Sequence, residues 1–158
     1  MRYVVQHRKA SYIKFLVVML SIFVQGFLTL FVVNKLLSGE FFPEDIKNLV
    51  AGNPDIFLEG IETGQIVEKV HIELFLLSVV FLTVFSINLR LNIKDSHKIT
   101  LSIFSFLNIW VYVLSFFLIK LYPAVFSNIY TISLSLLLTV ISAVNLMNII
   151  FFTAGKIK

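Results

Sequence analysis

The sequence contains no cysteine among its 158 residues. Disulfide bonds, thiolate metal sites, iron–sulfur clusters and redox catalysis by thiols are therefore excluded. Familiar catalytic motifs are also missing: the chain has no HExxH zinc motif, no GxSxG nucleophile elbow, no glycine-rich phosphate loop and no paired carboxylates. We therefore expect a protein that is not an enzyme.

Histidine is scarce as well, and the three histidines are His7, His71 and His97. Small cytochromes b hold haem between histidines on different helices at one depth in the membrane. Here His71 lies at one end of an apolar run, whereas His7 and His97 lie beside the opposite ends of such runs. We therefore predict no cofactor, with haem b or a quinone bound at His71 as the alternative.

Charged residues make up only 14% of the chain, whereas apolar residues make up 58%. The mean hydropathy is +0.94, and a soluble domain has only about 45–50% apolar residues. The apolar residues fall into runs of about 20, the length that a helix needs to cross a hydrocarbon core of roughly 30 Å. The sequence predicts an all-α integral membrane four-helix bundle, in contact with the lipid bilayer and forming one domain over residues 1–158. The predicted membrane-spanning segments are residues 15–34, 70–89, 99–119 and 128–153.

Residues 36–63 form the one sizeable segment outside these runs, and they carry six acidic residues against the single base Lys47. A first short helix is predicted to begin at Pro43 and to stop at Gly52. A second is predicted to begin at Pro54, with Asn53 as its N-cap. Their apolar residues would let these helices cap the bundle or lie on the membrane surface.

The basic residues cluster beside the ends of the apolar runs, near the N-terminus, in the loop after residue 89 and near the C-terminus. This distribution follows the positive-inside rule and predicts that both termini are cytoplasmic, that segment 36–63 is extracytoplasmic, and that the protein lies in the cell inner (plasma) membrane. No basic patch is interleaved with aromatic residues, so we expect no nucleic-acid partner.

The stretch from Gly64 to Leu91 combines polar first turns with a long apolar run. Its polar residues include a candidate functional cluster of Glu68, His71 and Glu73. Such groups could relay protons, bind a quinone head group or ligate a metal or haem. They are equally typical of anchors in the head-group region, and too few ligands are present for a zinc site, so we predict no metal site.

Small polar residues recur at three- and four-residue steps in the third and fourth apolar runs. Because such residues share one helix face and are costly when they face lipid, we interpret them as helix–helix contacts. A polar permeation path is the alternative, although neither stripe carries a charge. The stripe of the third run comprises Ser102, Ser105, Asn108, Tyr112 and Ser115. The stripe of the fourth run comprises Thr131, Ser135, Thr139, Ser142 and Asn145, and Asn148 extends it.

Together these features predict a non-catalytic, small polytopic membrane protein. We interpret it as an accessory or assembly subunit that binds other membrane protein subunits or further copies of itself. One alternative is a small transporter or proton-linked channel that uses His71, Glu68 and Glu73. Another is a membrane subunit that transfers electrons through haem or quinone.

Overall fold

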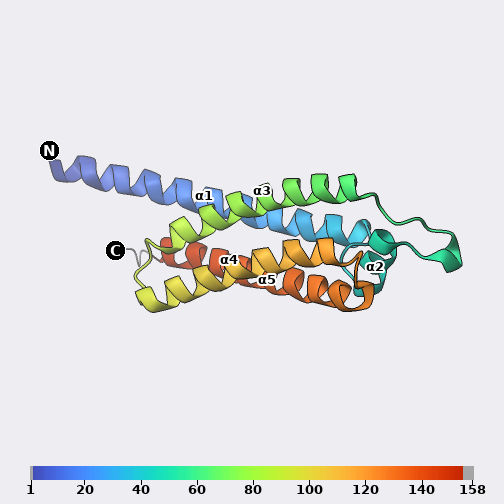
Figure 1. Cartoon of the computed structure of the whole chain (residues 1–158). Coiled ribbons are helices and arrows are strands. Elements are labelled where there is room, and N and C mark those ends of the chain that lie inside the picture. The colour runs from blue at the N-terminus through green and yellow to red at the C-terminus, as the bar shows by residue number, and fades with distance from the viewer. Residues whose placement is uncertain (1, 155–158) are drawn as a thin grey trace.

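The computed structural model describes the backbone of residues 2–154 and the side chains of residues 12–55 and 57–154. Within that backbone range the chain forms five α-helices, one 3-10 helix and no β-strand (Figure 1). Several residues used in the sequence predictions lie outside the described side chains. These are Arg2, Arg8, Lys9, Lys156 and Lys158, which support the topology, and His7, which was considered for haem binding.

Four of the helices are long enough and apolar enough to cross a membrane. The prediction of an all-helical membrane protein with four spanning segments is confirmed. Each helix begins before its predicted apolar span because the polar turns ahead of the span are helical too, whereas the second and third of these long helices end one residue before the predicted ends at 89 and 119. Two of them begin with favourable residues, Pro123 at the first helical position and Asp95 in the first turn. The bounds are α1 Arg2–Leu37, α3 Thr63–Asn88, α4 Asp95–Leu118 and α5 Pro123–Thr153.

The last long helix, α5, lies at the centre of the bundle. It packs along α4 and along α1, and it also contacts α3, whereas α1 and α3 touch each other only sparsely. Its apolar side chains are buried among these neighbours, with Leu134, Leu137 and Ile141 almost wholly enclosed. The two described ends of the chain lie at one end of the bundle, opposite α2 (Figure 1).

The segment between α1 and α3 lies at the far end of the bundle (Figure 1). Helix α2 (Pro43–Ala51) begins and ends where the sequence predicts, and it buries Ile46 and Val50 against the bundle. The second predicted short helix is the 3-10 helix η1 (Pro54–Ile56), whose N-cap Asn53 accepts a hydrogen bond from a backbone N–H. Helix α2 therefore packs against this end of the bundle, and we call the segment between α1 and α3 the cap.

Candidate functional site

Lys35 lies in the last turn of α1, and only 1% of its side chain is exposed. Its ammonium group donates to Glu40 Oε2 at 2.7 Å, to Glu73 Oε1 at 2.5 Å and to the hydroxyl of Tyr130 at 3.1 Å. An ammonium group has three N–H donors, so every donor of Lys35 is used. The buried cation is therefore both paired and fully hydrogen-bonded, as a buried charge must be.

The contacts of Lys35 close into a ring that takes one residue from each long helix. Tyr112 of α4 donates its hydroxyl to Glu73 of α3, and its oxygen lies 3.2 Å from the hydroxyl oxygen of Tyr130 of α5. The two tyrosine rings stack with their centroids 4.9 Å apart. The ring consequently ties the four long helices together at the end that α2 covers.

Glu40 and Lys69 extend this ring toward the cap. Lys69 of α3 donates to Glu40, which lies in the turn after α1 and is also bound by Lys35. Burial would raise the pKa of the Glu40 carboxyl, but the two ammonium groups outweigh this and hold its pKa below the usual value of 4.5. The positive charges of Lys35 and Lys69 are balanced by the negative charges of Glu40 and Glu73. We call this set the charged cluster: Lys35, Glu40, Lys69, Glu73, Tyr112 and Tyr130.

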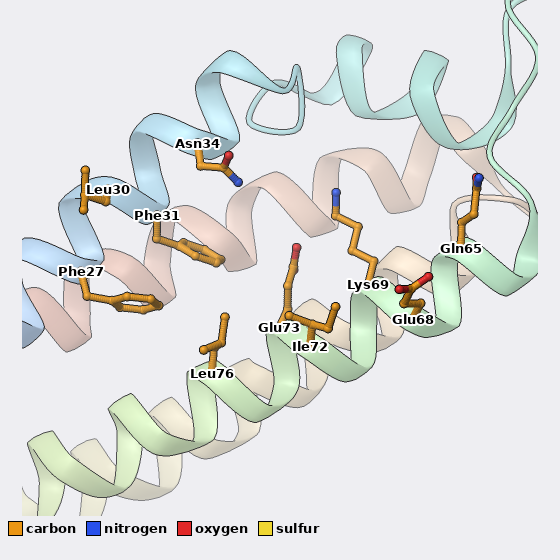
Figure 2. Close-up of a pocket in the computed structure, with 10 residues that line it drawn as sticks. All are labelled: Phe27, Leu30, Phe31, Asn34, Gln65, Glu68, Lys69, Ile72, Glu73 and Leu76. Atoms are coloured by element: carbon orange, nitrogen blue, oxygen red, sulfur yellow. The ribbon is translucent and has the colours of Figure 1, made fainter.

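A groove of about 570 Å³ opens between α1 and α3 beside the charged cluster (Figure 2). Its polar side chains gather at the end nearest α2, and its apolar side chains line the opposite end. We call it the α1–α3 groove. It is lined by Phe27, Leu30, Phe31 and Asn34 of α1 and by Gln65, Glu68, Lys69, Ile72, Glu73 and Leu76 of α3.

Only part of the candidate cluster predicted on α3 lines the α1–α3 groove. Glu68 and Glu73 both line the α1–α3 groove, and Glu73 is the deeper of the two because it takes part in the charged cluster. His71 is exposed, does not line the groove, and has no hydrogen-bond or ion-pair partner among the described residues. The groove therefore contains two of the three predicted residues.

The same geometry bears on metal and haem binding. Within the described part of the chain, no three His, Asp or Glu side chains are placed to hold a metal ion. His71 lies in the first turns of α3, and His97 lies in the first turn of α4, at the opposite end of the bundle. These two histidines cannot reach one haem within a single chain.

The small polar residues of α4 and α5 divide into two groups. Asn108 donates to the Ser133 carbonyl across the α4–α5 contact at 2.9 Å. Ser142 accepts from Gln25 of α1 at 2.7 Å, and Asn145 donates to the Ser21 carbonyl at 2.8 Å. These bonds join helices.

Four further members of the two stripes bond within their own helix or have no described partner. Ser102 and Thr139 each donate to the carbonyl four residues earlier. Ser105 is buried, with no hydrogen-bond partner for its hydroxyl in the described structure. Ser135 lies half-buried beside Thr139.

Part of the α5 stripe faces out of the bundle. Thr131, Ser135 and Thr139 follow each other at four-residue steps and line a surface hollow of about 420 Å³ on α5. Thr139 also lines a second hollow, of about 560 Å³, between α5 and α1. The hydroxyl oxygen of Thr131 is itself buried, with no described hydrogen-bond partner. We therefore call Ser135 and Thr139 the α5 hydroxyl face.

Sequence reasoning missed most of the charged cluster. Lys35 resembled an ordinary basic residue flanking a membrane span, and Glu40 resembled one acid among six in the cap. Lys69 and Glu73 stand four residues apart, a spacing at which opposite charges on one helix can pair. In the structure each pairs instead with a residue from another segment. The one available signal was Tyr112, which continues the polar stripe of α4 into the cluster.

Residues 39–156 match the family model Aq_1264_TM, a transmembrane helical domain. The match contains every member of the charged cluster except Lys35, which lies in α1 before the matched residues. No curated protein and no solved structure matches the chain. Because the matched residues make up more than half of the sequence, the chain belongs to the Aq_1264_TM family of transmembrane helical domains.

Proposed function

We propose that this multi-pass membrane protein is a non-catalytic accessory subunit of a larger membrane complex, and that its α5 hydroxyl face contacts a transmembrane helix of a partner subunit. The proposal assigns the chain no catalytic residue and no cofactor. It places the protein in the cell inner membrane with both termini cytoplasmic, on the strength of the basic residues that flank the spans.

The observation that carries the proposal is the outward direction of the α5 hydroxyl face. Small and hydroxyl-bearing residues are enriched where membrane helices meet, because they let the backbones approach and can bond across the contact. Here they line two hollows on the surface of the bundle that share Thr139, and Thr29 and Ala143 continue the small-residue lining toward α1. Gly26 of α1 is exposed, and a methyl group added there would meet no atom within 4 Å.

The charged cluster supports a structural role more than a transport role. Its charges balance, and all three donors of Lys35 are engaged. Next to it along the bundle lie the enclosed apolar residues Leu77, Leu134 and Leu137. An ion path normally requires ionisable or carbonyl groups along its length. We therefore infer that the cluster fixes the helices on which the partner docks.

Because the chain has no native cysteine, the proposal can be tested by cross-linking from single introduced cysteines. We compare Thr139→Cys on the α5 hydroxyl face with Val111→Cys, which faces outward from α4 and is 45% exposed. In native membranes, we expect the first variant to cross-link to a second membrane protein and the second variant to give no such product.

Two results would contradict the proposal. One is equal cross-linking from both positions, which would show random collisions in the bilayer. The other is a product at position 139 that contains only further copies of this chain, which would show a homo-oligomer.

A further inference from the structure

The α1–α3 groove has the size and the ordered polarity of a binding site for an amphiphile. Its volume of about 570 Å³ lies within the roughly 300–1,000 Å³ typical of small-molecule sites. Phe27, Leu30 and Leu76 line one end, whereas Gln65 and Glu68 line the other (Figure 2). The apolar and polar ends of the groove succeed each other along the helix axes, so an occupant with a polar head and an apolar tail would lie parallel to the helices.

The polar end of the groove also lies at the level expected for lipid head groups. Asn88, the last residue of α3, is nineteen positions after Lys69 in the sequence. At 1.5 Å per residue this is about 28 Å, close to the thickness of a hydrocarbon core. Glu68 and Lys69 therefore stand near one boundary of the membrane when the end of α3 stands near the other.

Adjacent opposite charges at this end specify the head group. Lys69 donates to Glu40 alone, so two of its three N–H donors remain for a ligand. Glu68 has no hydrogen-bond or ion-pair partner among the described residues. Lys69 thus suits a phosphate oxygen, and Glu68 suits an N–H donor that carries positive charge. A purely anionic head group would satisfy Lys69 but would face the carboxylate of Glu68.

We propose that the α1–α3 groove binds one zwitterionic phospholipid with a primary ammonium head group, of the phosphatidylethanolamine type. The phosphate lies against Lys69, the ammonium group lies against Glu68, and one acyl chain follows Leu30 and Leu76. The adjacent Lys35 takes no part because its three donors are already engaged. This site is separate from the α5 hydroxyl face, so the two proposals can fail independently.

The test is a competition for lipid. The purified full-length protein is mixed with equimolar phosphatidylethanolamine and phosphatidylglycerol of the same acyl chains, and retained lipid is counted by native mass spectrometry. We expect one phosphatidylethanolamine molecule per chain, retained in preference to phosphatidylglycerol. Equal or greater retention of phosphatidylglycerol would overturn the proposal.

Two matched pairs of variants locate the lipid. Glu68→Gln should reduce the preference for phosphatidylethanolamine over phosphatidylglycerol about threefold to fivefold, the size expected for one partly exposed ion pair. Its control is Glu59→Gln, at an exposed acid of the cap, which should leave this preference unchanged. Leu30→Trp, which fills the groove, should abolish retention, whereas Leu107→Trp, on the outer face of α4, should not. All four positions are exposed, so the fold should tolerate the changes. If the two members of either pair behave alike, the lipid is not held in this groove.

Discussion

Lys35 is a cation enclosed among the long helices, and each of its three hydrogen bonds goes to a different segment of the chain. Taking an ammonium ion out of water costs several kcal/mol even after the surroundings relax. Phe31, Tyr112 and Tyr130 add to the compensation, because each presents its ring within 6 Å of the ammonium nitrogen. The residue is therefore stable only while its partners stay in place.

Removing this ammonium group should destabilise the bundle strongly. Lys35→Met leaves Glu73 with a buried carboxylate and no counter-ion, and breaking a buried pair in this way costs about 3–5 kcal/mol. We expect a loss of that size in the free energy of unfolding, measured by denaturation in mixed micelles. Lys47→Met is the matched control, because the Lys47–Glu44 pair is far more exposed and should contribute less than about 1 kcal/mol.

The double variant Lys35→Met/Glu73→Gln separates charge balance from side-chain packing. It leaves Lys69 and Glu40 as a neutral pair, so we expect part of the lost stability to return. A single Lys35→Met variant as stable as Lys47→Met would show that the charged cluster contributes little to stability.

Glu40 should make stability sensitive to acid. Its pKa is lower in the folded protein than in the unfolded chain, so its stabilising effect is present above pH 4.5 and is lost as the pH falls through the folded value. We expect acidification below pH 4.5 to lower the thermal unfolding midpoint less in Glu40→Gln than in the native protein. Glu59→Gln, at an exposed carboxylate, should retain the native response. An identical fall in the native protein and Glu40→Gln would contradict this role.

At the scale of the elements, the membrane-spanning helices could be predicted because the signal for each is spread over about 20 residues. No single side chain decides whether a segment is predicted to span the membrane. The starts of the short segments were predictable for a different reason, since Pro43 and Pro54 are favoured at the first helical position whatever surrounds them. In contrast, the close approach of Gly60 to α2 could not be predicted. A methyl group there would lie 2.6 Å from the Val50 carbonyl oxygen, a contact set by the path of the whole cap.

The charged cluster escaped prediction because most of its contacts join residues distant in sequence, although Lys35 and Glu40 are only five residues apart. Lys35 and Glu73 are 38 residues apart, and Lys35 and Tyr130 are 95 residues apart. Helical periodicity shows which residues share a face of one helix, but it does not show which faces meet. The position of His71 was uncertain for the same reason: sequence alone did not show that it lies outside the groove that Glu68 and Glu73 line.

At the scale of the whole molecule, the proposed sidedness gives a clear expectation. Segment 36–63 should be extracytoplasmic, and the basic loop between α3 and α4 should be cytoplasmic. In intact cells, an impermeant thiol reagent should label the Glu59→Cys variant, and it should label Asn92→Cys only after the membrane is permeabilised. Both residues are exposed. The reverse pattern would place the cap inside the cell.

The ring of Lys35, Glu73, Tyr112 and Tyr130 has a consequence for the order in which the protein matures. Its first member is synthesised with α1, and its last is supplied by α5. A nascent chain that has released only its first helices from the ribosome therefore holds a lysine whose final acceptor has not yet been made. Closure of this end of the bundle must wait for the last helix to insert, so a chain truncated before α5 should be a substrate for membrane quality-control proteases.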